Sequence, residues 1–469
     1  MRKRDIVRAG AVLAAAALLS SCGKTAASAP SETASETTTT VTEVTAPTET
    51  TTTQAAAVEA DAPVVGETTA APKKTAKLKL ETKSEVDVFT RMTVGDLVSA
   101  SNAMISNADA TIDTSALGEH EVNIIYDHEG DIQQQTVKYN VVDKTPPVLF
   151  NFGSNTLVRG NAFELDNYIS YADNYDRAPA ASYTGDLDPY TTGDYEIKVT
   201  VSDSSGNSTE LTIPIKVAES VGEQVIDAGT EMDFSTLSNF TAGNPLKGID
   251  VSEWQKEIDF ASLKGAGCEF CIMRAGYRGK DGIVEDPFFA RNLEGAKAAG
   301  IQRGVYFYST ATTVDAAREE AAWLAGKLGG EKLDLPVAFD WENFVSFQEY
   351  GINLNDLNRV YDAFAAELEK NGYSTMLYGS SNFLDTFWNC GESSPARTAK
   401  CWVANYDLSF EGNSYIWQCS GSGKIKGIEG TVDLDLWYQN AVNPADVPNV
   451  EPPKPADTEI PNEPPPTAE

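Results

Sequence analysis

An alternation of apolar, strand-like runs with amphipathic helical stretches extends from residue 246 to residue 440 and constrains the fold more than any other feature. In the stretch 313–328, residues Ala317, Ala321, Leu324 and Leu328 share one helical face. Such alternation is typical of parallel strands joined by helical crossovers. The expected strands are 247–251, 270–275, 304–309, 335–341, 374–378, 400–406, 415–419 and 431–436, and the expected helices are 286–299, 313–328 and 354–370.

Eight strands within roughly 195 residues predict a barrel, and the scarcity of helical pattern after residue 390 predicts short links between its last strands. In such a barrel the functional residues lie at the C-terminal strand ends. Polar and aromatic residues occupy those positions: Asp250, Arg274, Tyr308, Asp340, Glu342, Tyr378, Asn405, Tyr406, Gln418 and Asp433.

The run that ends in Asp340-Trp341-Glu342 is the sharpest local signal. Residues i and i+2 of a strand point to the same face, so Asp340 and Glu342 are expected together, with Trp341 on the opposite face. Two carboxylates placed together after an apolar run cost free energy unless they pair or act chemically. Their repulsion raises one pKa, which leaves one proton donor and one carboxylate, as general acid catalysis of glycoside cleavage requires. The plainer interpretation is a surface acidic pair.

Charge and histidine content exclude several function classes. The chain has 36 Lys and Arg against 69 Asp and Glu, a net charge of −33, which argues against nucleic acid as a partner. Its two histidines, His120 and His128, both precede the predicted barrel. A Ser-His-Asp, Cys-His or His-ligated zinc site is therefore not expected there. We expect no cofactor and no metal at this site.

The N-terminus has the layout of a secretory signal. Basic residues precede the apolar stretch 9–19, and Leu19-Ser20-Ser21-Cys22 resembles the bacterial lipoprotein cleavage box. We expect residues 1–21 to be removed and Cys22 to carry the lipid, which would hold the chain on the outer face of the bacterial membrane. An ordinary secretory signal is the alternative. The Thr/Ser/Ala/Glu/Pro-rich segment 22–77 is predicted to be a disordered tether and the acidic, Pro-rich segment 441–469 a disordered tail.

Two segments, 78–144 and 146–218, show the period-two alternation of half-buried strands. They resemble each other at an offset of 75 residues, with Gly118-Glu119-His120-Glu121-Val122 matching Gly193-Asp194-Tyr195-Glu196-Ile197. The second copy looks like the immunoglobulin-like modules of bacterial surface proteins, and both are expected to be β-sandwiches. They could be spacers or binders of carbohydrate or cell wall. Asp173, Asn174 and Asp176 are interpreted as turn formers rather than Ca²⁺ ligands.

Several motifs of residues 246–437 resemble glycoside hydrolase family 25, the Chalaropsis-type lysozymes. They are Gly248-Ile249-Asp250-Val251-Ser252 with Trp254-Gln255, Ile258-Asp259-Phe260, Asp340-x-Glu342, Trp402-x-Ala404-x-Tyr406, Trp417-Gln418 and Gly430-Thr431-Val432-Asp433-Leu434-Asp435. The resemblance implies an α/β TIM-like (β/α) barrel with a modified last third, here preceded by two all-β immunoglobulin-like sandwiches. It departs from the family at Cys419, where an aromatic residue is usual, and at Asp435, where Asn is common.

The resemblance also implies a reaction and residue roles. The reaction is hydrolysis of the β-1,4 bond between N-acetylmuramic acid and N-acetylglucosamine, with peptidoglycan glycan strands as the partner. By position, Glu342 is the general acid, and Asp340 assists through the 2-acetamido group of the substrate. Asp250 and Asp433 are the other active-site carboxylates. Substrate-binding roles are expected for Arg274, Tyr308, Tyr378, Trp402, Tyr406 and Gln418, with barrel packing as the alternative for the four aromatic residues.

Two other classes remain as alternatives. One is a catalytically weak surface protein that only binds peptidoglycan, although all four carboxylates are present. The other is a chitinase-like barrel, whose longer acidic motif is replaced here by Val337, Ala338 and Phe339. Among the cysteines after Cys22, Cys268 and Cys271 are expected to pack in the core, whereas a pairing of Cys390 with Cys401 is left open.

Overall fold

The computed structural model describes residues 79–221, 231–388, 395–410 and 414–439. The predicted signal segment 1–21, Cys22, the tether 22–77, the tail 441–469 and Cys390 lie outside these residues. Within the described ranges, no helix combines the length and the apolar character that crossing a bilayer requires.

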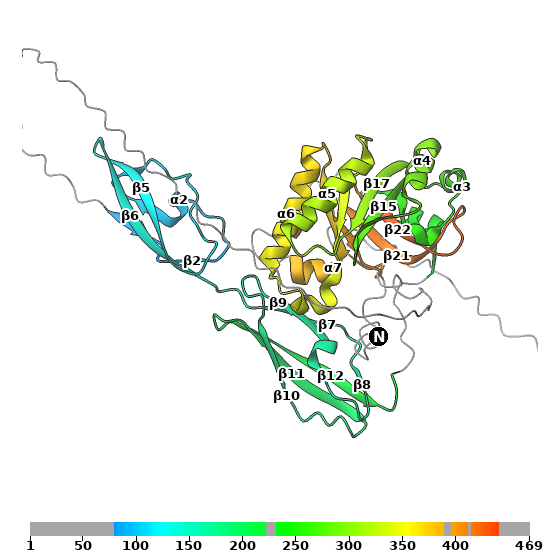
Figure 1. Cartoon of the computed structure of the whole chain (residues 1–469), viewed down its shortest axis with the longest axis horizontal. Coiled ribbons are helices and arrows are strands. Elements are labelled where there is room, and N and C mark those ends of the chain that lie inside the picture. The colour runs from blue at the N-terminus through cyan, green and yellow to red at the C-terminus, as the bar shows by residue number, and fades with distance from the viewer. Residues whose placement is uncertain (1–78, 222–230, 389–394, 411–413, 440–469) are drawn as a thin grey trace, which may run out of the picture. The chain divides into compact units, whose positions relative to one another are not determined.

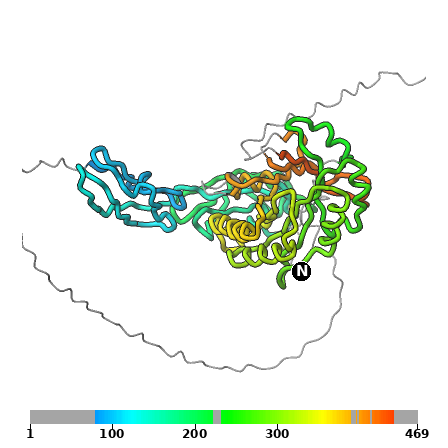
Figure 2. Tube along the Cα trace, turned by 90° about the horizontal axis from the view of Figure 1, so that it is seen from above, coloured from blue at the N-terminus to red at the C-terminus, as the bar shows by residue number. Residues whose placement is uncertain are grey.

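Residues 79–144 form a four-stranded sheet in the order β2-β6-β5-β4 and a two-stranded sheet of β1 and β3. The elements are β1 (Leu80–Thr82), β2 (Glu85–Asp87), α2 (Val94–Leu97), β3 (Val98–Ala100), β4 (Met104–Ile105), β5 (Gly118–His128) and β6 (Asp131–Val142). Strands β5 and β6 make a long antiparallel hairpin, which Figure 2 shows within the blue to cyan part of the chain.

Residues 147–218 repeat this plan, with a four-stranded sheet in the order β10-β11-β12-β8 and a two-stranded sheet of β7 and β9. The elements are β7 (Val148–Asn151), β8 (Thr156–Val158), η2 (Leu165–Asn167), β9 (Ile169–Ala172), β10 (Ala180–Thr184), β11 (Gly193–Ser202) and β12 (Ser208–Ala218). The predicted repeat is visible in the pairing, because Gly118 lies opposite Val141 in the first hairpin and Gly193 opposite Val217 in the second.

The third region is a closed barrel of eight strands, seen at the upper right of Figure 1. Around the barrel the order is β14-β15-β17-β18-β19-β20-β21-β22, and β22 pairs with both β21 and β14. The strands are β14 (Leu246–Val251), β15 (Phe270–Gly279), β17 (Gln302–Tyr308), β18 (Val337–Asp340), β19 (Thr375–Ser380), β20 (Cys401–Ala404), β21 (Ile416–Lys424) and β22 (Val432–Trp437), with β13 (Met232–Asp233) beside β21 and β16 (Gly282–Glu285) beside β15.

Helices connect the first strands of the barrel. They are α3 (Phe260–Gly265), α4 (Phe289–Ala299), α5 (Val314–Leu328), α6 (Leu354–Lys370), α7 (Ser381–Phe383) and α8 (Pro395–Thr398), with the short turns η3 (Phe234–Asn239), η4 (Glu253–Gln255), η5 (Asn343–Glu349) and η6 (Leu384–Trp388). Helix α5 begins at the N-cap Thr313, whose side chain accepts a hydrogen bond from the Ala316 N–H, and ends before the left-handed Gly329. Helices α5 and α6 pack side by side (Figure 1).

The predicted fold class is wrong for the barrel and is not confirmed for the two β modules. The barrel is not a TIM-like (β/α) barrel, because β22 runs antiparallel to both of its neighbours and no described residue between β20 and β22 is helical. The physical reason is link length: residues 425–431 are too few for the dozen or more that a parallel crossover needs, so the chain must reverse. The immunoglobulin-like sandwiches are not confirmed. Each β module has one four-stranded and one two-stranded sheet, whereas an immunoglobulin fold has seven or more strands.

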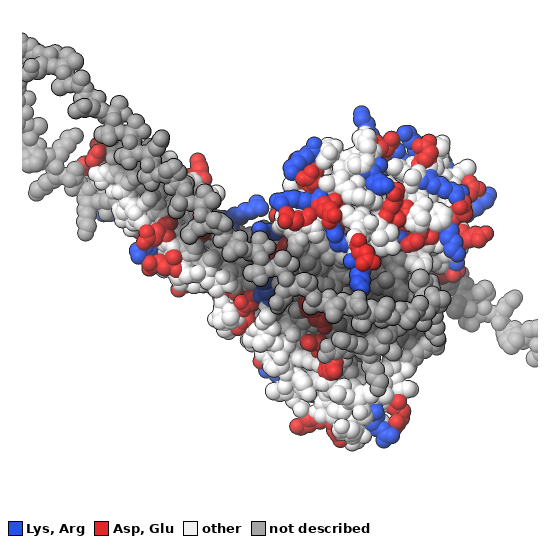
Figure 3. Space-filling view, viewed as in Figure 1, with Lys and Arg blue, Asp and Glu red and all other residues white. Residues whose placement is uncertain are grey.

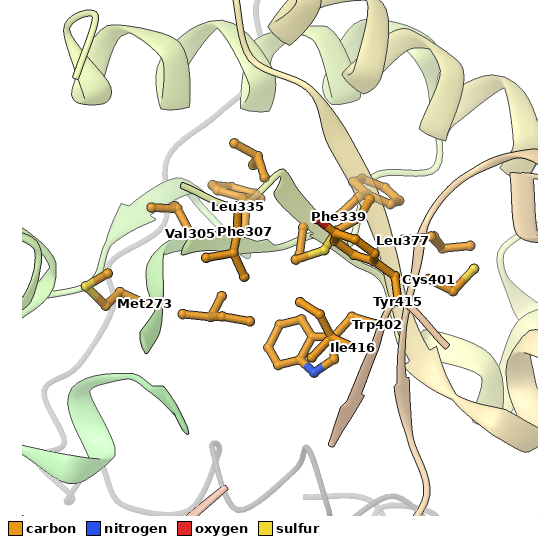
Figure 4. Packing of buried hydrophobic residues seen from close by; sticks show 14 of the residues in the cluster. Met273, Val305, Phe307, Leu335, Phe339, Leu377, Cys401, Trp402, Tyr415 and Ile416 are labelled. Atoms are coloured by element: carbon orange, nitrogen blue, oxygen red, sulfur yellow. The ribbon is translucent and has the colours of Figure 1, made fainter. Parts of the chain in front are cut away.

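Successive side chains of the barrel strands point alternately outward, against the helices, and into the barrel. Phe307 and Phe339 face the helices, where each contacts the ring of Phe364 on α6. Figure 4 shows these phenylalanines with Val305 of β17 and Leu377 of the next strand, β19. Because the side-chain period of a strand is two, Tyr308 and Asp340, one position further on, point to the opposite face. On the outer surface shown in Figure 3, acidic and basic side chains are interspersed over the barrel.

Candidate active site

Strand register brings four of the predicted site residues to one level of the barrel. Tyr308 on β17 is the cross-strand partner of Asp340 on β18, Asp340 is the partner of Tyr378 on β19, and Tyr378 is the partner of Trp402 on β20. Tyr308, Asp340 and Tyr378 occupy the C-terminal halves of parallel strands, as the barrel rule predicts, whereas Trp402 is the second residue of β20.

The antiparallel strand β22 adds two aspartates, which lie opposite residues of β14 and β21. Asp433 is the cross-strand partner of Asp250 on β14, and Asp435 is the partner of Gln418 on β21. The reversal that contradicts the predicted fold class therefore places two further carboxylates in the ring.

A single cavity collects all ten site residues that the sequence predicted. They are Asp250, Arg274, Tyr308, Asp340, Glu342, Tyr378, Trp402, Tyr406, Gln418 and Asp433. Four lining residues were not predicted as site residues: Ser252, Trp254, Gln255 and Tyr306. The cavity has a volume of about 130 Å³. Ligand pockets usually measure ~300 Å³ or more, so this cavity can hold the reacting part of a larger substrate rather than the whole of it.

Gln418 is the centre of the hydrogen bonding in the cavity. Its Nε2 donates to Asp250 Oδ2 at 2.8 Å, and its Oε1 accepts from the hydroxyls of Tyr378 and Tyr406, each at 3.0 Å. These three bonds fix the orientation of the amide, because only its nitrogen can donate and only its oxygen can accept. Trp402 Nε1 donates to Asp435 Oδ1 at 2.8 Å, and its ring packs 4.5 Å from that of Tyr378.

The carboxylates of the cavity are crowded and little solvated. Asp250 and Asp340 are only 5% and 4% exposed, whereas Glu342 and Asp433 are partly exposed at the cavity. Burial raises the pKa of Asp250 well above its usual value, and the negative charge of Asp435 raises it further. Burial, followed by the charges of Asp250 and Glu342, raises the pKa of Asp433 in the same way. Burial and mutual repulsion thus both favour the protonated forms of these acids.

Asp340 and Glu342 form the central pair. The chain leaves strand geometry after Asp340, yet both side chains line the same cavity, and Trp341 between them is fully buried on the other side. Burial raises the pKa of Glu342 to about 7. Burial and the neighbouring Glu342 charge raise the pKa of Asp340, while the positive charge of Arg274 opposes that rise. The charge of Arg274 offsets only part of this rise, so the pKa of Asp340 stays well above its usual value.

Arg274 lies in the cavity wall, and its guanidinium donates hydrogen bonds to two other carboxylates. Its Nε donates to Asp286 Oδ2 at 2.9 Å, and its Nη2 donates to Glu253 Oε1 at 2.8 Å. The side chain is 3% exposed, and that of Asp286 is fully buried. This arrangement suits a fixed positive charge that acts on its neighbours, and it leaves less of the guanidinium for a substrate than the sequence-based role assumed.

Two of the unpredicted residues had a signal in the sequence. Tyr306 lies two positions before Tyr308 on the same strand face, and its ring packs 5.9 Å from that of Trp402. Trp254 belongs to the first motif, and at 50% exposure it offers an indole face at the cavity rim. Asp435, noted in the sequence only as a departure from the family pattern, is fully buried beside Asp250.

No cysteine of the described residues lines the cavity. Cys268 and Cys271 are fully buried free thiols in the barrel core, which confirms the core-packing prediction. Cys419, also buried and free, donates through Sγ to the carbonyl of Leu434. Cys401 is buried in the same core, and its suggested partner Cys390 lies outside the described residues.

Comparison with known proteins defines the class of the barrel. Residues 249–428 match the family "Glycosyl hydrolases family 25". These residues span the barrel from β14 to the link before β22, so this region is a glycoside hydrolase domain of family 25. The resemblance predicted from the sequence motifs is confirmed for this part of the chain.

Individual relatives carry lysozyme names. The chain is 29% identical over 194 residues to the "Autolytic lysozyme" of Clostridium acetobutylicum, which covers 40% of this chain and 55% of that protein. It is 29% identical over 211 residues to "Lysozyme M1" of Streptomyces globisporus, with 42% and 69% covered. The chain thus spans a little over half the length of the first relative. Among solved structures, the bacterial lysozyme from Streptomyces coelicolor aligns with a TM-score of 0.35 at 26% identity, covering 43% of this chain and 94% of that one.

Proposed function

We propose that the barrel hydrolyses the β-1,4 bond between N-acetylmuramic acid and N-acetylglucosamine in peptidoglycan. The observation that carries this proposal is the convergence of Asp250, Asp340, Glu342 and Asp433 on one cavity walled by tyrosine and tryptophan. Acetal cleavage needs a proton donor for the leaving oxygen and negative charge near the positive centre that forms, and this cavity offers both. The lysozyme names of the relatives support the choice of substrate.

In this proposal Glu342 is the general acid. A pKa of about 7 keeps it largely protonated below neutral pH, and its partial exposure lets it reach a substrate oxygen in the cavity. Glu342 gives its proton to the glycosidic oxygen as the bond from that oxygen to the anomeric carbon breaks. Water supplies the hydroxyl of the new reducing end, and its remaining proton restores the acid.

Asp340 supplies the negative charge. Its Oδ1 is buried and has no hydrogen-bond partner among the described residues, so this oxygen is available to a substrate group. The positive charge of Arg274 opposes the rise in the pKa of Asp340, and in this proposal Asp340 is the carboxylate partner of the protonated Glu342. Two routes use such a carboxylate: it can orient the 2-acetamido group of the substrate as an internal nucleophile, or it can stabilise the positive charge while water attacks directly.

The remaining residues position the substrate and these acids. Gln418 fixes the carboxylate of Asp250 and the hydroxyls of Tyr378 and Tyr406. Burial raises the pKa values of both tyrosines, which keeps their hydroxyls neutral. The half-exposed Trp254 provides a flat apolar face at the rim, on which a sugar ring can stack.

We further propose that the enzyme acts at the outer face of the membrane, held by acyl chains on Cys22. The support is the order of basic residues, apolar stretch, small residues and Cys22 at the N-terminus. Two acyl chains give stable anchoring where a single chain is marginal.

The test is digestion of purified, insoluble peptidoglycan by the full chain. New reducing sugars are quantified beside the exposed, matched control Glu294→Gln on α4 and the variant Glu342→Gln. Reducing ends from the parent chain and the control, with almost none from Glu342→Gln, are expected. Binding to peptidoglycan without any release of reducing ends would favour the alternative of a binding protein and refute the enzymatic assignment.

A further inference from the structure

Three aspartates outside the barrel gather at the start of the second β module. Asp143 lies between β6 and β7, Asp173 follows β9, and Asp203 follows β11. One carboxylate oxygen from each lies within 4.8 Å of those of the other two. Asp173 is fully buried, Asp143 is 7% exposed, and Asp203 is partly exposed. Burying acidic groups together is costly unless something compensates their charge.

Hydrogen bonds account for four of the six carboxylate oxygens of these aspartates, and one oxygen of Asp173 and one of Asp143 have no partner. Asp173 Oδ2 accepts from the backbone N–H groups of Tyr175 at 2.9 Å and Asp176 at 2.7 Å, while its Oδ1 is buried without a hydrogen-bond partner. Asp143 Oδ1 accepts from the Thr145 N–H at 3.2 Å and from Asn174 Nδ2 at 3.3 Å, and its Oδ2 is likewise buried without a partner. The turn-former interpretation of the sequence therefore leaves one oxygen of each buried carboxylate unaccounted for.

No protein cation compensates this charge. Among the described residues, no ion pair involves any of the three aspartates, and Asp87 on β2 adds a further negative charge near Asp143. Burial, together with the charges of Asp143 and Asp203, raises the pKa of Asp173 to about 6. Asp176, which the sequence grouped with Asp173, is engaged by the backbone and hydroxyl of Ser204 and stands apart from the cluster.

We propose that Asp143, Asp173 and Asp203 bind one calcium ion. The donors are all oxygens, which hard cations prefer, and the cluster offers neither the imidazole nor the thiolate that zinc selects. Oxygens on a shared calcium ion lie up to about 5 Å apart, since each Ca–O distance is about 2.3 to 2.6 Å, so the observed spacing fits. Asn174 donates through Nδ2 to Asp143 Oδ1, and its own Oδ1 is buried and has no hydrogen-bond partner among the described residues.

A calcium ion at this position binds three segments that are distant in sequence, those that follow β6, β9 and β11. Asn207, in the turn after β11, donates through its backbone and side chain to Asp203 and through Nδ2 to the carbonyl of Asp143. The loop after Asp173 also makes hydrogen bonds to the start of α6, where the Asp173 carbonyl accepts from the Leu354 N–H at 2.8 Å. The ion therefore stabilises the turn, the loop and the segment that enters the module.

The experiment titrates the full chain, freed of divalent metal by chelator and buffer exchange, with CaCl₂ in a calorimeter. Sites of extracellular modules have Kd values of about 10⁻⁴ to 10⁻³ M, so the titration extends to ~10 mM. The parent chain is expected to bind one calcium ion, and differential scanning calorimetry is expected to show a Tm rise of at least about 5 °C for the module near saturation. No binding heat and no Tm shift would overturn the proposal.

Variants separate ligation from folding. Asp173→Asn and Asp203→Asn should weaken calcium binding at least ~10-fold, whereas the matched control Asp194→Asn, an exposed position on β11, should bind as the parent does. In chelator, Asp173→Asn should be no less stable than the parent, because one of the repelling carboxylates is gone. Undiminished calcium binding by both cluster variants, or an equal response to Mg²⁺, would refute the assignment. Peptidoglycan hydrolysis is measured for the same variants, so that failure of the calcium proposal can be distinguished from failure of the proposed activity of the barrel.

Discussion

Replacing Glu342 with Gln tests the proton donor through both catalysis and stability. The change keeps the size of the side chain and removes the acid. Loss of a general acid costs about 10²- to 10⁴-fold in turnover. In the parent chain, activity should fall as pH rises through about 7, because Glu342 then loses the proton it donates.

The stability effect follows from the same pKa. Burial raises the pKa of Glu342 from 4.5 to about 7, so the folded state holds a proton that the unfolded state has released between these values. The parent barrel is therefore expected to lose stability between pH 4.5 and pH 7, by about 3 kcal/mol from this group. Glu342→Gln lacks this loss, so its stability relative to the parent should increase over that range and level off above pH 7.

Tryptophan fluorescence in urea measures this effect for the barrel alone, because all 7 tryptophans lie between Trp254 and Trp437. Midpoints are compared at pH 4.5, 6 and 8 for the parent, Glu342→Gln and the exposed control Glu294→Gln. The control should follow the parent in both stability and activity. Near-normal turnover by Glu342→Gln, or a stability difference that does not grow with pH, would refute the reasoning.

Three other variants test the surroundings of the acids and the anchor. Arg274→Met leaves the buried Asp286 unpaired and should cost about 3 to 5 kcal/mol in urea unfolding, part of which the double variant with Asp286→Asn should recover; no loss would show that the ion pair contributes little. Gln418→Leu removes the shared partner of Asp250, Tyr378 and Tyr406 and should destabilise the barrel by about 3 kcal/mol or more, so an unchanged midpoint would contradict the network. Cys22→Ser should release the chain from the membrane fraction or block its processing, whereas unchanged fractionation would exclude the lipid anchor.

The strands and helices of the barrel could be predicted from sequence because each has its own side-chain period. The predicted helix 354–370 coincides with α6, and all eight predicted strands overlap strands of the barrel. The direction of a strand cannot be predicted in this way, because apolar and polar side chains alternate identically whether β22 is parallel or antiparallel to its neighbours. The short link 425–431 requires the reversal of direction, whereas the sequence pattern predicts only that the last strands are joined by short links.

The site was predictable because its residues end strands, and the barrel brings strand ends together. Asp435 shows the limit of this reasoning, because its burial beside Asp250 depends on the antiparallel pairing of β22 with β14 and β21. Asp143, Asp173 and Asp203 show another limit. Each of them, taken singly, has the sequence context of a turn former, and only the folded chain brings their oxygens together.

Identification of the sugar at the newly formed reducing end tests the central claim most directly. Purified peptidoglycan is digested with the full chain, the products are reduced with borohydride, and the muropeptides are sequenced by mass spectrometry. The proposed mechanism predicts reduced N-acetylmuramic acid at the new ends, with stem peptides uncut. Reduced N-acetylglucosamine or free stem peptides, formed by the parent chain and absent with Glu342→Gln, would contradict it.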